Sequence, residues 1–233
     1  MSAPRRLVVL RHGRTGHNLE GRIQGQLDIG LDEVGLAQAA AVADALAEAA
    51  PYAVLSSDLS RALVTAEAIA AKAGLSVVAD ERLREIALGG WEGLTVEQAR
   101  ERFPDEHAAW VAGEDKPRGG GETYREASAR ATQCLREAID GAPDGATVIA
   151  VTHGGTARAT LGGLLELDPA AWWRISPLGN TCWSVLVEGD RGWRLERHNT
   201  GLGPLVGAAV GAHDLGSRAV GGQTSSPDVE PVK

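Results

Sequence analysis

The stretch LVVLRHGRTGHN at residues 7–18 decides the fold. Four aliphatic residues, typical of a strand buried on both faces, end abruptly at Arg11 and His12, and Gly13 follows. A second strand-like stretch, ATVIAVTHGG at residues 146–155, also runs into a histidine followed by glycine. Ligands of open α/β sheets bind beyond the carboxyl ends of the strands, so both stretches indicate a sheet edge that carries chemistry.

Strand and helix patterns alternate along the chain. Strands are expected over residues 6–10, 52–57, 76–80 and 146–152, followed by a hairpin with strands near 182–187 and 191–198. Helices are expected over residues 31–49, 60–74, 95–103, 123–140 and 156–166, with Asp32 as an N-cap, Gly74 as a terminator and Pro104 as a stop. This alternation predicts an α/β fold, a three-layer α/β/α sandwich around a mostly parallel central sheet.

Composition narrows the classes of function. The 233 residues carry a net charge of −8 with no run of Lys or Arg, which argues against a nucleic-acid partner. Cys134 and Cys182 stand far apart and are expected to be free thiols. The chain shows no signal peptide and no apolar run of about 18 residues, so we expect a cytoplasmic protein without a membrane partner.

The domain organisation follows from a change in composition near the C-terminus. From about Gly201 the chain is rich in Gly, Ser, Pro and Ala without periodicity. We therefore expect one domain over residues 1–203 and a flexible C-terminal tail over residues 204–233.

Four side chains at the strand ends predict a phosphate site. If the strands are parallel neighbours, His12 and His153 meet at one edge together with Arg11 and with Arg61 from the stretch SSDLSR. Guanidinium groups match phosphate oxygens bidentately. The glycine after each histidine, such as Gly154, lets the backbone approach the phosphate, and the N-terminus of the following helix offers amide dipoles.

The same residues predict covalent catalysis. A neutral imidazole at His12 can attack phosphorus, and the neighbouring arginines disfavour its protonation. A proton donor for the leaving alkoxide is also needed. Glu85, in the stretch RLREIALGGWEGLT after the third strand, is the candidate, because a carboxyl group beside a phosphate dianion retains its proton more readily.

Four segments, LRHGRTGHN, SSDLSRA, LREIALGGWEG and VTHGG, resemble in order the signature segments of the histidine phosphatase superfamily, the phosphoglycerate mutase-like proteins. The resemblance covers roughly the first 200 residues. It implies a phosphoglycerate mutase-like fold and a homodimer, which is common in the family. It also implies a role for each matching residue: His12 as phosphorylated nucleophile, Glu85 as proton donor, Arg11, Arg61, His153 and Asn18 at the phosphate, and Gln24 at the substrate body.

Within the family the phosphatase branch is favoured over the mutases, because the stretch from Trp91 to Glu122 is short and contains PRGGGET. The stretches RIQGQLD, GGGE and PLGNTCWSVL are similar to those of glucosyl-3-phosphoglycerate phosphatases, so glucosyl-3-phosphoglycerate is the expected substrate. A phosphoglycerate mutase and an α-ribazole phosphatase are the enzyme alternatives.

A phospho-ligand-binding module with the same fold is the non-enzyme alternative. Such a module is expected to have lost the nucleophile or the acid, yet His12 and Glu85 are both present. His12 and His17 lack the Cys or carboxylate partners of a metal site, so neither a metal nor a cofactor is expected. Arg22 is expected at the solvated surface, and the six tryptophans are expected in packing roles.

Overall fold

A six-stranded sheet, in the order β3-β2-β4-β1-β5-β6, forms the centre of the computed structural model. Neighbouring strands among β3, β2, β4 and β1 are parallel, whereas β5 runs antiparallel to β1 and β6 antiparallel to β5. The expected mostly parallel sheet with a terminal hairpin is therefore confirmed. The strands are β1 Arg6–Arg11, β2 Ala53–Ser56, β3 Val77–Ala79, β4 Thr147–Thr152, β5 Trp183–Gly189 and β6 Gly192–Thr200.

Helices cover both faces of this sheet. The structure describes residues 3–202, so the tail expected over 204–233 lies outside the described residues. None of the helices in this described part is long and apolar enough to cross a membrane. The helices are α1 Gly16–Glu20, α2 Glu33–Ala47, α3 Ser60–Ala73, α4 Val96–Arg102, α5 Pro104–Val111, α6 Tyr124–Asp140 and α7 Gly154–Leu164.

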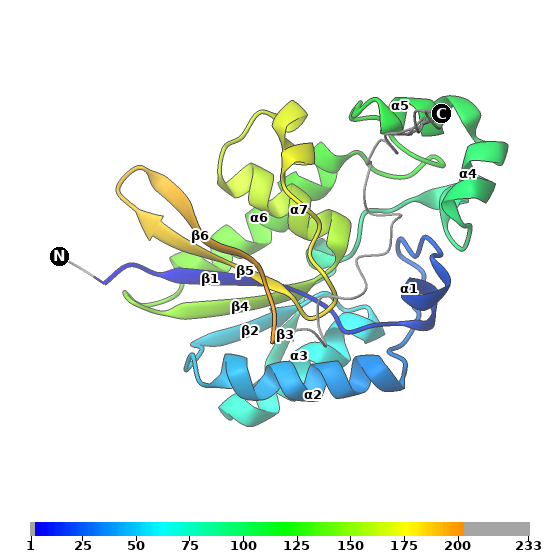
Figure 1. Cartoon of the computed structure of the whole chain (residues 1–233). Coiled ribbons are helices and arrows are strands. Elements are labelled where there is room, and N and C mark those ends of the chain that lie inside the picture. Colours follow the sequence, from blue (N-terminus) through cyan, green and yellow to red (C-terminus); the bar gives the residue numbers. More distant parts are fainter. Residues whose placement is uncertain (1–2, 203–233) are drawn as a thin grey trace, which may run out of the picture.

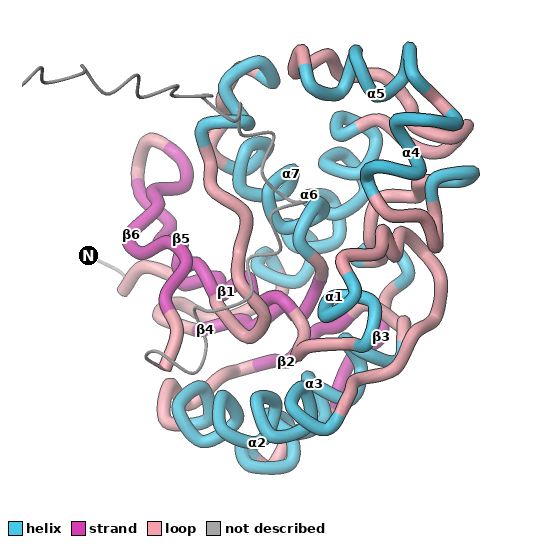
Figure 2. Tube along the Cα trace, turned by 45° about the vertical axis from the view of Figure 1, so that its right-hand side comes forward, coloured by secondary structure: helices cyan, strands magenta, loops and turns pink. Residues whose placement is uncertain are grey.

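The three layers follow from the alternation of side chains along the buried strands. In β1, Val8 and Leu10 pack into a core cluster with residues of α2 and α3 such as Ile69. Leu7 and Val9 point the other way, into a cluster with residues of α6 and α7. Figures 1 and 2 show α2 and α3 below the sheet and α6 and α7 above it. The expected α/β/α sandwich is confirmed.

Some of the residues expected to begin or end a helix do so, and others have a different position in the helices. Asp32 caps α2 by accepting a hydrogen bond from the Gly35 amide, and Gly74 ends α3 in a left-handed conformation. Pro104 does not only end α4: it is the first residue of α5, because proline needs no amide partner in a first turn. The helix α7 begins at residue 154, two residues earlier than expected, and the short helix α1 was not expected.

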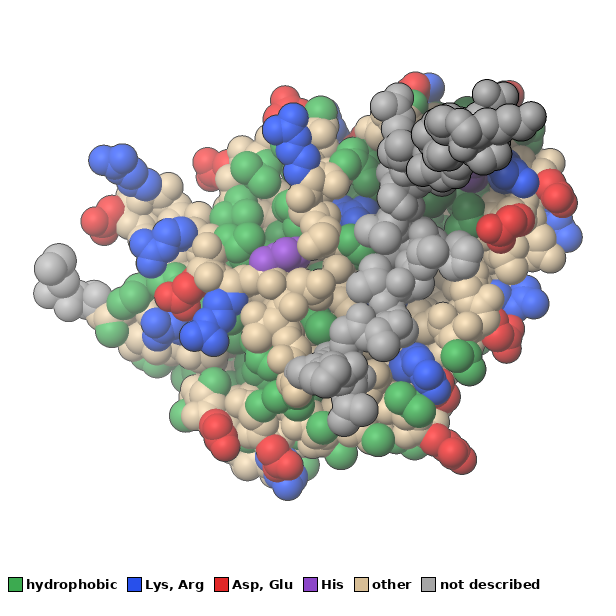
Figure 3. Space-filling model, viewed as in Figure 1, with side chains coloured by type: hydrophobic (Ala, Val, Ile, Leu, Met, Phe, Trp, Pro, Cys, Tyr) green, Lys and Arg blue, Asp and Glu red, His purple; other side chains and the backbone are tan. Residues whose placement is uncertain are grey.

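The pairing of β1 with β4 positions the two histidines. Arg11 lies opposite Thr152 in a parallel register, so the residues that follow, His12 and His153, leave the sheet side by side. The helices α1, α4 and α5 lie beyond this edge of the sheet (Figure 1). On the described part of the face shown in Figure 3, acidic and basic side chains are interspersed without a continuous basic stripe.

Candidate active site

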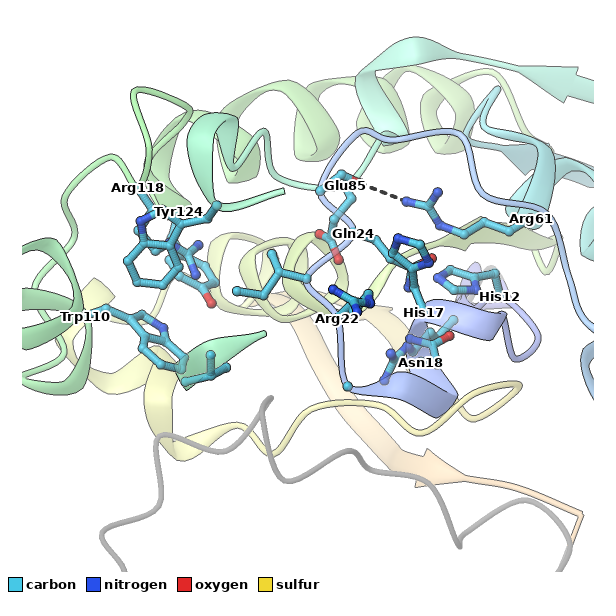
Figure 4. A pocket seen from close by; sticks show the side chains of 16 residues that line it. His12, His17, Asn18, Arg22, Gln24, Arg61, Glu85, Trp110, Arg118 and Tyr124 are labelled. Carbon is cyan, nitrogen blue, oxygen red and sulfur yellow. Dashed lines mark hydrogen bonds between the residues drawn. The ribbon is translucent and has the colours of Figure 1, made fainter. Parts of the chain in front are cut away.

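A pocket lies beyond the carboxyl ends of the parallel strands, where the sequence predicts one (Figure 4). Two predicted residues do not line it. His153 is fully buried beside His12, with ring centroids 5.1 Å apart, and Gly154 is the first residue of α7. The predicted residues that line the pocket are Arg11, His12, Asn18, Gln24, Arg61 and Glu85.

The ring of His12 is held in one neutral tautomer. Its Nδ1 lies 2.7 Å from the carbonyl oxygen of Gly13, which can only accept, so Nδ1 carries the proton. Burial, followed by the charges of Arg61 and Arg11, holds the pKa of His12 well below its usual value. The expected effect of the arginines is present, although burial is the larger cause. Nε2 therefore keeps a free lone pair at neutral pH.

His153 has the opposite tautomer. The Nε of Arg61 lies 3.2 Å from Nδ1 of His153 and can only donate, so Nδ1 accepts and the proton of the neutral ring is on Nε2. Burial and the charge of Arg61 hold the pKa of His153 well below its usual value. Within residues 3–202, this buried Nε2 has no hydrogen-bond partner. His153 thus keeps an N–H donor beside His12.

Arg61 is fixed by backbone carbonyls as well as by His153. Its Nη1 donates to the carbonyl of Leu27 at 2.6 Å and its Nη2 to that of Gly25 at 2.8 Å. Burial lowers the pKa of Arg61 to about 10, which leaves the side chain charged at neutral pH. These three bonds use three of the five guanidinium protons, and two are left for a ligand.

The segment before β5 supports Arg11 and His12 from the other side. Arg11 Nη1 donates to the carbonyl of Leu178 at 2.7 Å. The Asn180 side-chain amide donates to the carbonyl of His12 at 3.0 Å, and the Thr181 amide donates to that of Arg11 at 3.0 Å. This support could not be predicted, because the sequence does not reveal that residues about 170 positions apart make contact.

Asn18 and Gln24 both present amide donors to the pocket. Asn18 Oδ1 accepts from the Thr15 amide and from Nδ2 of Asn180, both at 3.2 Å. Gln24 Oε1 accepts from the Thr15 hydroxyl at 2.9 Å. Because each oxygen is engaged, the NH₂ group of each side chain is the end left for a ligand. Thr15 itself is fully buried and was missed by the sequence analysis.

Glu85 contributes a carboxylate to this set of donors. Its Oε1 accepts from the amide and the hydroxyl of Thr156 at 2.9 and 3.1 Å and from the Ile86 amide at 2.9 Å. Its Oε2 accepts from the Gly155 amide at 3.1 Å. Two amides at the N-terminus of α7, where amide dipoles were expected to face the phosphate, therefore hold Glu85 instead. Oε2, with one described donor, is the oxygen with room for a proton.

The loop that carries Glu85 is held by an ion pair from α6. Arg130 donates to the carbonyl oxygens of Arg82, Arg84 and Glu85 at 2.7–3.1 Å. Its Nε and Nη2 also donate to the two carboxylate oxygens of Glu122, both at 2.8 Å. Glu122 belongs to the GGGET segment, so this segment reaches the site through Arg130 and the Glu85 loop.

Two glycines close to the histidines, Gly13 and Gly155, make room for neighbouring protein atoms. A Cβ on Gly13 would lie 2.6 Å from the carbonyl oxygen of Gly35, so Gly13 admits the start of α2. A Cβ on Gly155 would lie 2.9 Å from Oε1 of Glu85. Both glycines thus make room for protein atoms that support the site.

Other pocket residues were not predicted. Arg22 keeps an exposed side chain, as expected, and also lines the pocket. His17, Trp110, Arg118 and Tyr124 line it too. They come from loops and helix ends whose approach to the strand ends is not readable from the sequence. The described residues contain no group of three or more His, Cys, Asp or Glu side chains that could hold a metal ion. Cys134 and Cys182 are buried and unbridged, as expected.

The chain belongs to the histidine phosphatase superfamily (branch 1), whose family model matches residues 7–201. The resemblance of the four segments is thereby confirmed, and the chain is a hydrolase of the phosphatase type. The glucosyl-3-phosphoglycerate phosphatase of Mycobacterium tuberculosis is 40% identical over 189 residues, which cover 78% of this chain and 85% of that protein.

Two further comparisons agree with this assignment. The structure of a mycobacterial glucosyl-3-phosphoglycerate phosphatase in complex with VO₃ superposes with a TM-score of 0.80 and 38% identity, covering 84% of this chain and 100% of that one. The metal-independent phosphoserine phosphatase of Arabidopsis thaliana is 40% identical over 157 residues, which cover 66% of each chain.

The low pKa of His12 predicts a pH dependence of stability. Near pH 6.5 the unfolded chain binds a proton at His12 that the native state does not, so this contribution to stability is present above pH 6.5 and is lost as pH falls. Between pH 7 and 5.5 the free energy of unfolding should fall by about 1 kcal/mol more in the wild type than in His12→Gln. Urea denaturation at both pH values measures this difference, and equal losses in the two proteins would contradict the buried neutral imidazole.

Proposed function

We propose that the protein is a metal-independent phosphomonoesterase that works through a phosphohistidine on His12. One observation carries the proposal: N–H donors converge around a single unprotonated nitrogen, Nε2 of His12. The donors come from Arg61, Asn18 and Gln24, together with His153 Nε2, whose proton has no partner among the described residues. Such a set of donors suits the oxygens of a phosphate dianion.

The proposed reaction has two displacements at phosphorus. Nε2 of His12 attacks, the bond from phosphorus to the ester oxygen breaks, and Glu85 gives a proton from Oε2 to the departing alkoxide. A water molecule then attacks the phosphohistidine, the P–N bond breaks, and Glu85 takes the proton of the water. Inorganic phosphate leaves, and both side chains return to their starting state.

The arginine side chains and His153 have different roles in the proposed reaction. Arg11 and Arg61 neutralise the substrate dianion, and burial together with their charges holds the pKa of His12 low, which keeps Nε2 unprotonated for attack. His153 donates to an equatorial oxygen as charge develops in the transition state. None of these parts requires a metal, which agrees with the metal-independent activity in the name of the Arabidopsis relative.

The proposed substrate is glucosyl-3-phosphoglycerate. It shares with phosphoserine a phosphate on the terminal carbon of a three-carbon acid, and the two relatives are named for these two esters. The positive pocket of this acidic chain, with Arg11, Arg22 and Arg61 against Glu85 in its lining, suits a ligand with several negative charges. We further propose a cytoplasmic homodimer.

Phosphate release from p-nitrophenyl phosphate and from glucosyl-3-phosphoglycerate, with and without EDTA, tests the proposed function. We expect net release of inorganic phosphate, unchanged by EDTA, and loss of at least 1,000-fold in kcat for His12→Ala on both substrates. Activity that EDTA abolishes and a divalent metal restores would overturn the mechanism. Isomerisation without net phosphate release would assign the chain to the mutases instead.

Replacement of Glu85 by glutamine should depend on the leaving group. An alkoxide leaving group needs a proton, whereas p-nitrophenolate needs hardly any help. We therefore expect Glu85→Gln to lower kcat about 100-fold or more on glucosyl-3-phosphoglycerate, with a much smaller loss on p-nitrophenyl phosphate in the phosphorylation step. Single-turnover measurements isolate that step. Equal losses on both esters would exclude Glu85 as the proton donor.

A further inference from the structure

A second region of the pocket lies away from His12 and contains Arg118, Tyr124 and Trp110. Figure 4 shows these three side chains together at one end of the pocket and His12 and Arg61 at the other. Arg118 and Tyr124 flank the GGGET segment, and Trp110 lies in α5. The mechanism proposed above uses none of them.

Arg118 is a buried cation with an unusual environment. It is 7% exposed, and its guanidinium carbon lies 4.9 Å from the centroid of the Tyr124 ring. In residues 3–202 its guanidinium has no hydrogen bond or ion pair. By contrast, Arg61 donates three hydrogen bonds, and Arg22 binds Glu20 and the carbonyl of Gly93. None of the Arg118 nitrogen atoms is among the fully buried side-chain atoms of residues 3–202 that lack a partner, so its N–H groups are accessible from the pocket and available to a ligand.

The aromatic rings beside Arg118 are held in place by their neighbours. Tyr124 packs edge-on against Trp173, with centroids 5.1 Å apart. Trp110 packs edge-on against the buried Trp91, with centroids 5.9 Å apart. The planar guanidinium of Arg118 lies over the Tyr124 ring, and its N–H groups are the part that can donate to a ligand. This region is therefore preorganised for binding.

We propose that Arg118, Tyr124 and Trp110 form a distal subsite that binds the glycosyl part of a substrate whose phosphate lies at His12. The proposal rests on the proposed function. Aromatic rings offer apolar faces to the C–H groups of a sugar ring, and the guanidinium edge donates to its hydroxyl oxygens.

The position of the subsite favours a sugar over a second acidic group. Arg22 lies between the two ends of the pocket (Figure 4), so it is the nearer cation for a carboxylate on a three-carbon phosphoester. The charge of Arg118 is partly balanced by the Tyr124 ring, which lessens its need for an anion. The sugar is the part of the substrate that extends furthest from the phosphate.

Three substrates separate the contributions of the sugar, the three-carbon acid and the phosphate to kcat/KM. Glucosyl-3-phosphoglycerate has the sugar, 3-phosphoglycerate has the acid without the sugar, and p-nitrophenyl phosphate has neither. Arg118→Met keeps most of the stem and removes the donors. We expect it to lower kcat/KM for glucosyl-3-phosphoglycerate about 10- to 100-fold, chiefly through KM. The kcat/KM values for the other two substrates should stay within about twofold of those of the wild type.

Two further variants complete the experiment. Arg102→Met alters an exposed arginine at the end of α4 and should leave kcat/KM for all three substrates unchanged. Arg118→Lys keeps the charge but loses the planar set of guanidinium donors. Its kcat/KM for glucosyl-3-phosphoglycerate should therefore lie between those of the wild type and Arg118→Met. Thermal unfolding of each variant separates a loss of binding from a loss of folding.

The possible results are distinguishable. Absence of activity on p-nitrophenyl phosphate in the wild type overturns the proposed function. An active wild type overturns the distal subsite if it does not prefer glucosyl-3-phosphoglycerate to 3-phosphoglycerate. The subsite is also overturned if Arg118→Met lowers kcat/KM equally on both esters or on neither.

Discussion

The parallel register between β1 and β4 is the constraint on which the site depends. Because Arg11 lies opposite Thr152, the two strands release His12 and His153 at the same level, with ring centroids 5.1 Å apart. A shift of one residue would turn one of these histidines towards the opposite face of the sheet. The buried aliphatic residues of both strands fix that register, so the core of the fold also sets the geometry of the chemistry.

A hydrogen bond to one ring nitrogen of each histidine then converts two identical side chains into different groups. The Gly13 carbonyl places the proton of His12 on Nδ1, and the donor from Arg61 places that of His153 on Nε2. One ring offers a lone pair and the other offers a proton, while burial keeps both neutral. The proposed nucleophile, His12, and the proposed hydrogen-bond donor to the phosphate, His153, are thus distinguished by the hydrogen bond that each ring makes.

The sequence predicted the parts of this site that depend on local patterns. The aliphatic strands ending in His12 and His153 and the order of the four segments were sufficient for the sheet, its layers and six of the residues lining the pocket. What it could not provide were contacts between distant segments. Asn180 supports His12 across 168 positions, and the amides at the start of α7 bind Glu85 across about 70. These depend on how the loops close over the sheet edge, which residue patterns do not encode.

The most direct test of the account is the position of the phosphoryl group after rapid quenching with ³²P-labelled substrate. The tautomer of His12 requires attack by Nε2, so the label should be alkali-stable, acid-labile and attached to Nε2 of His12. Peptide mapping together with separation of the two phosphohistidine isomers measures this. Label on Nδ1, label on another residue, or turnover without a covalent intermediate would contradict the account.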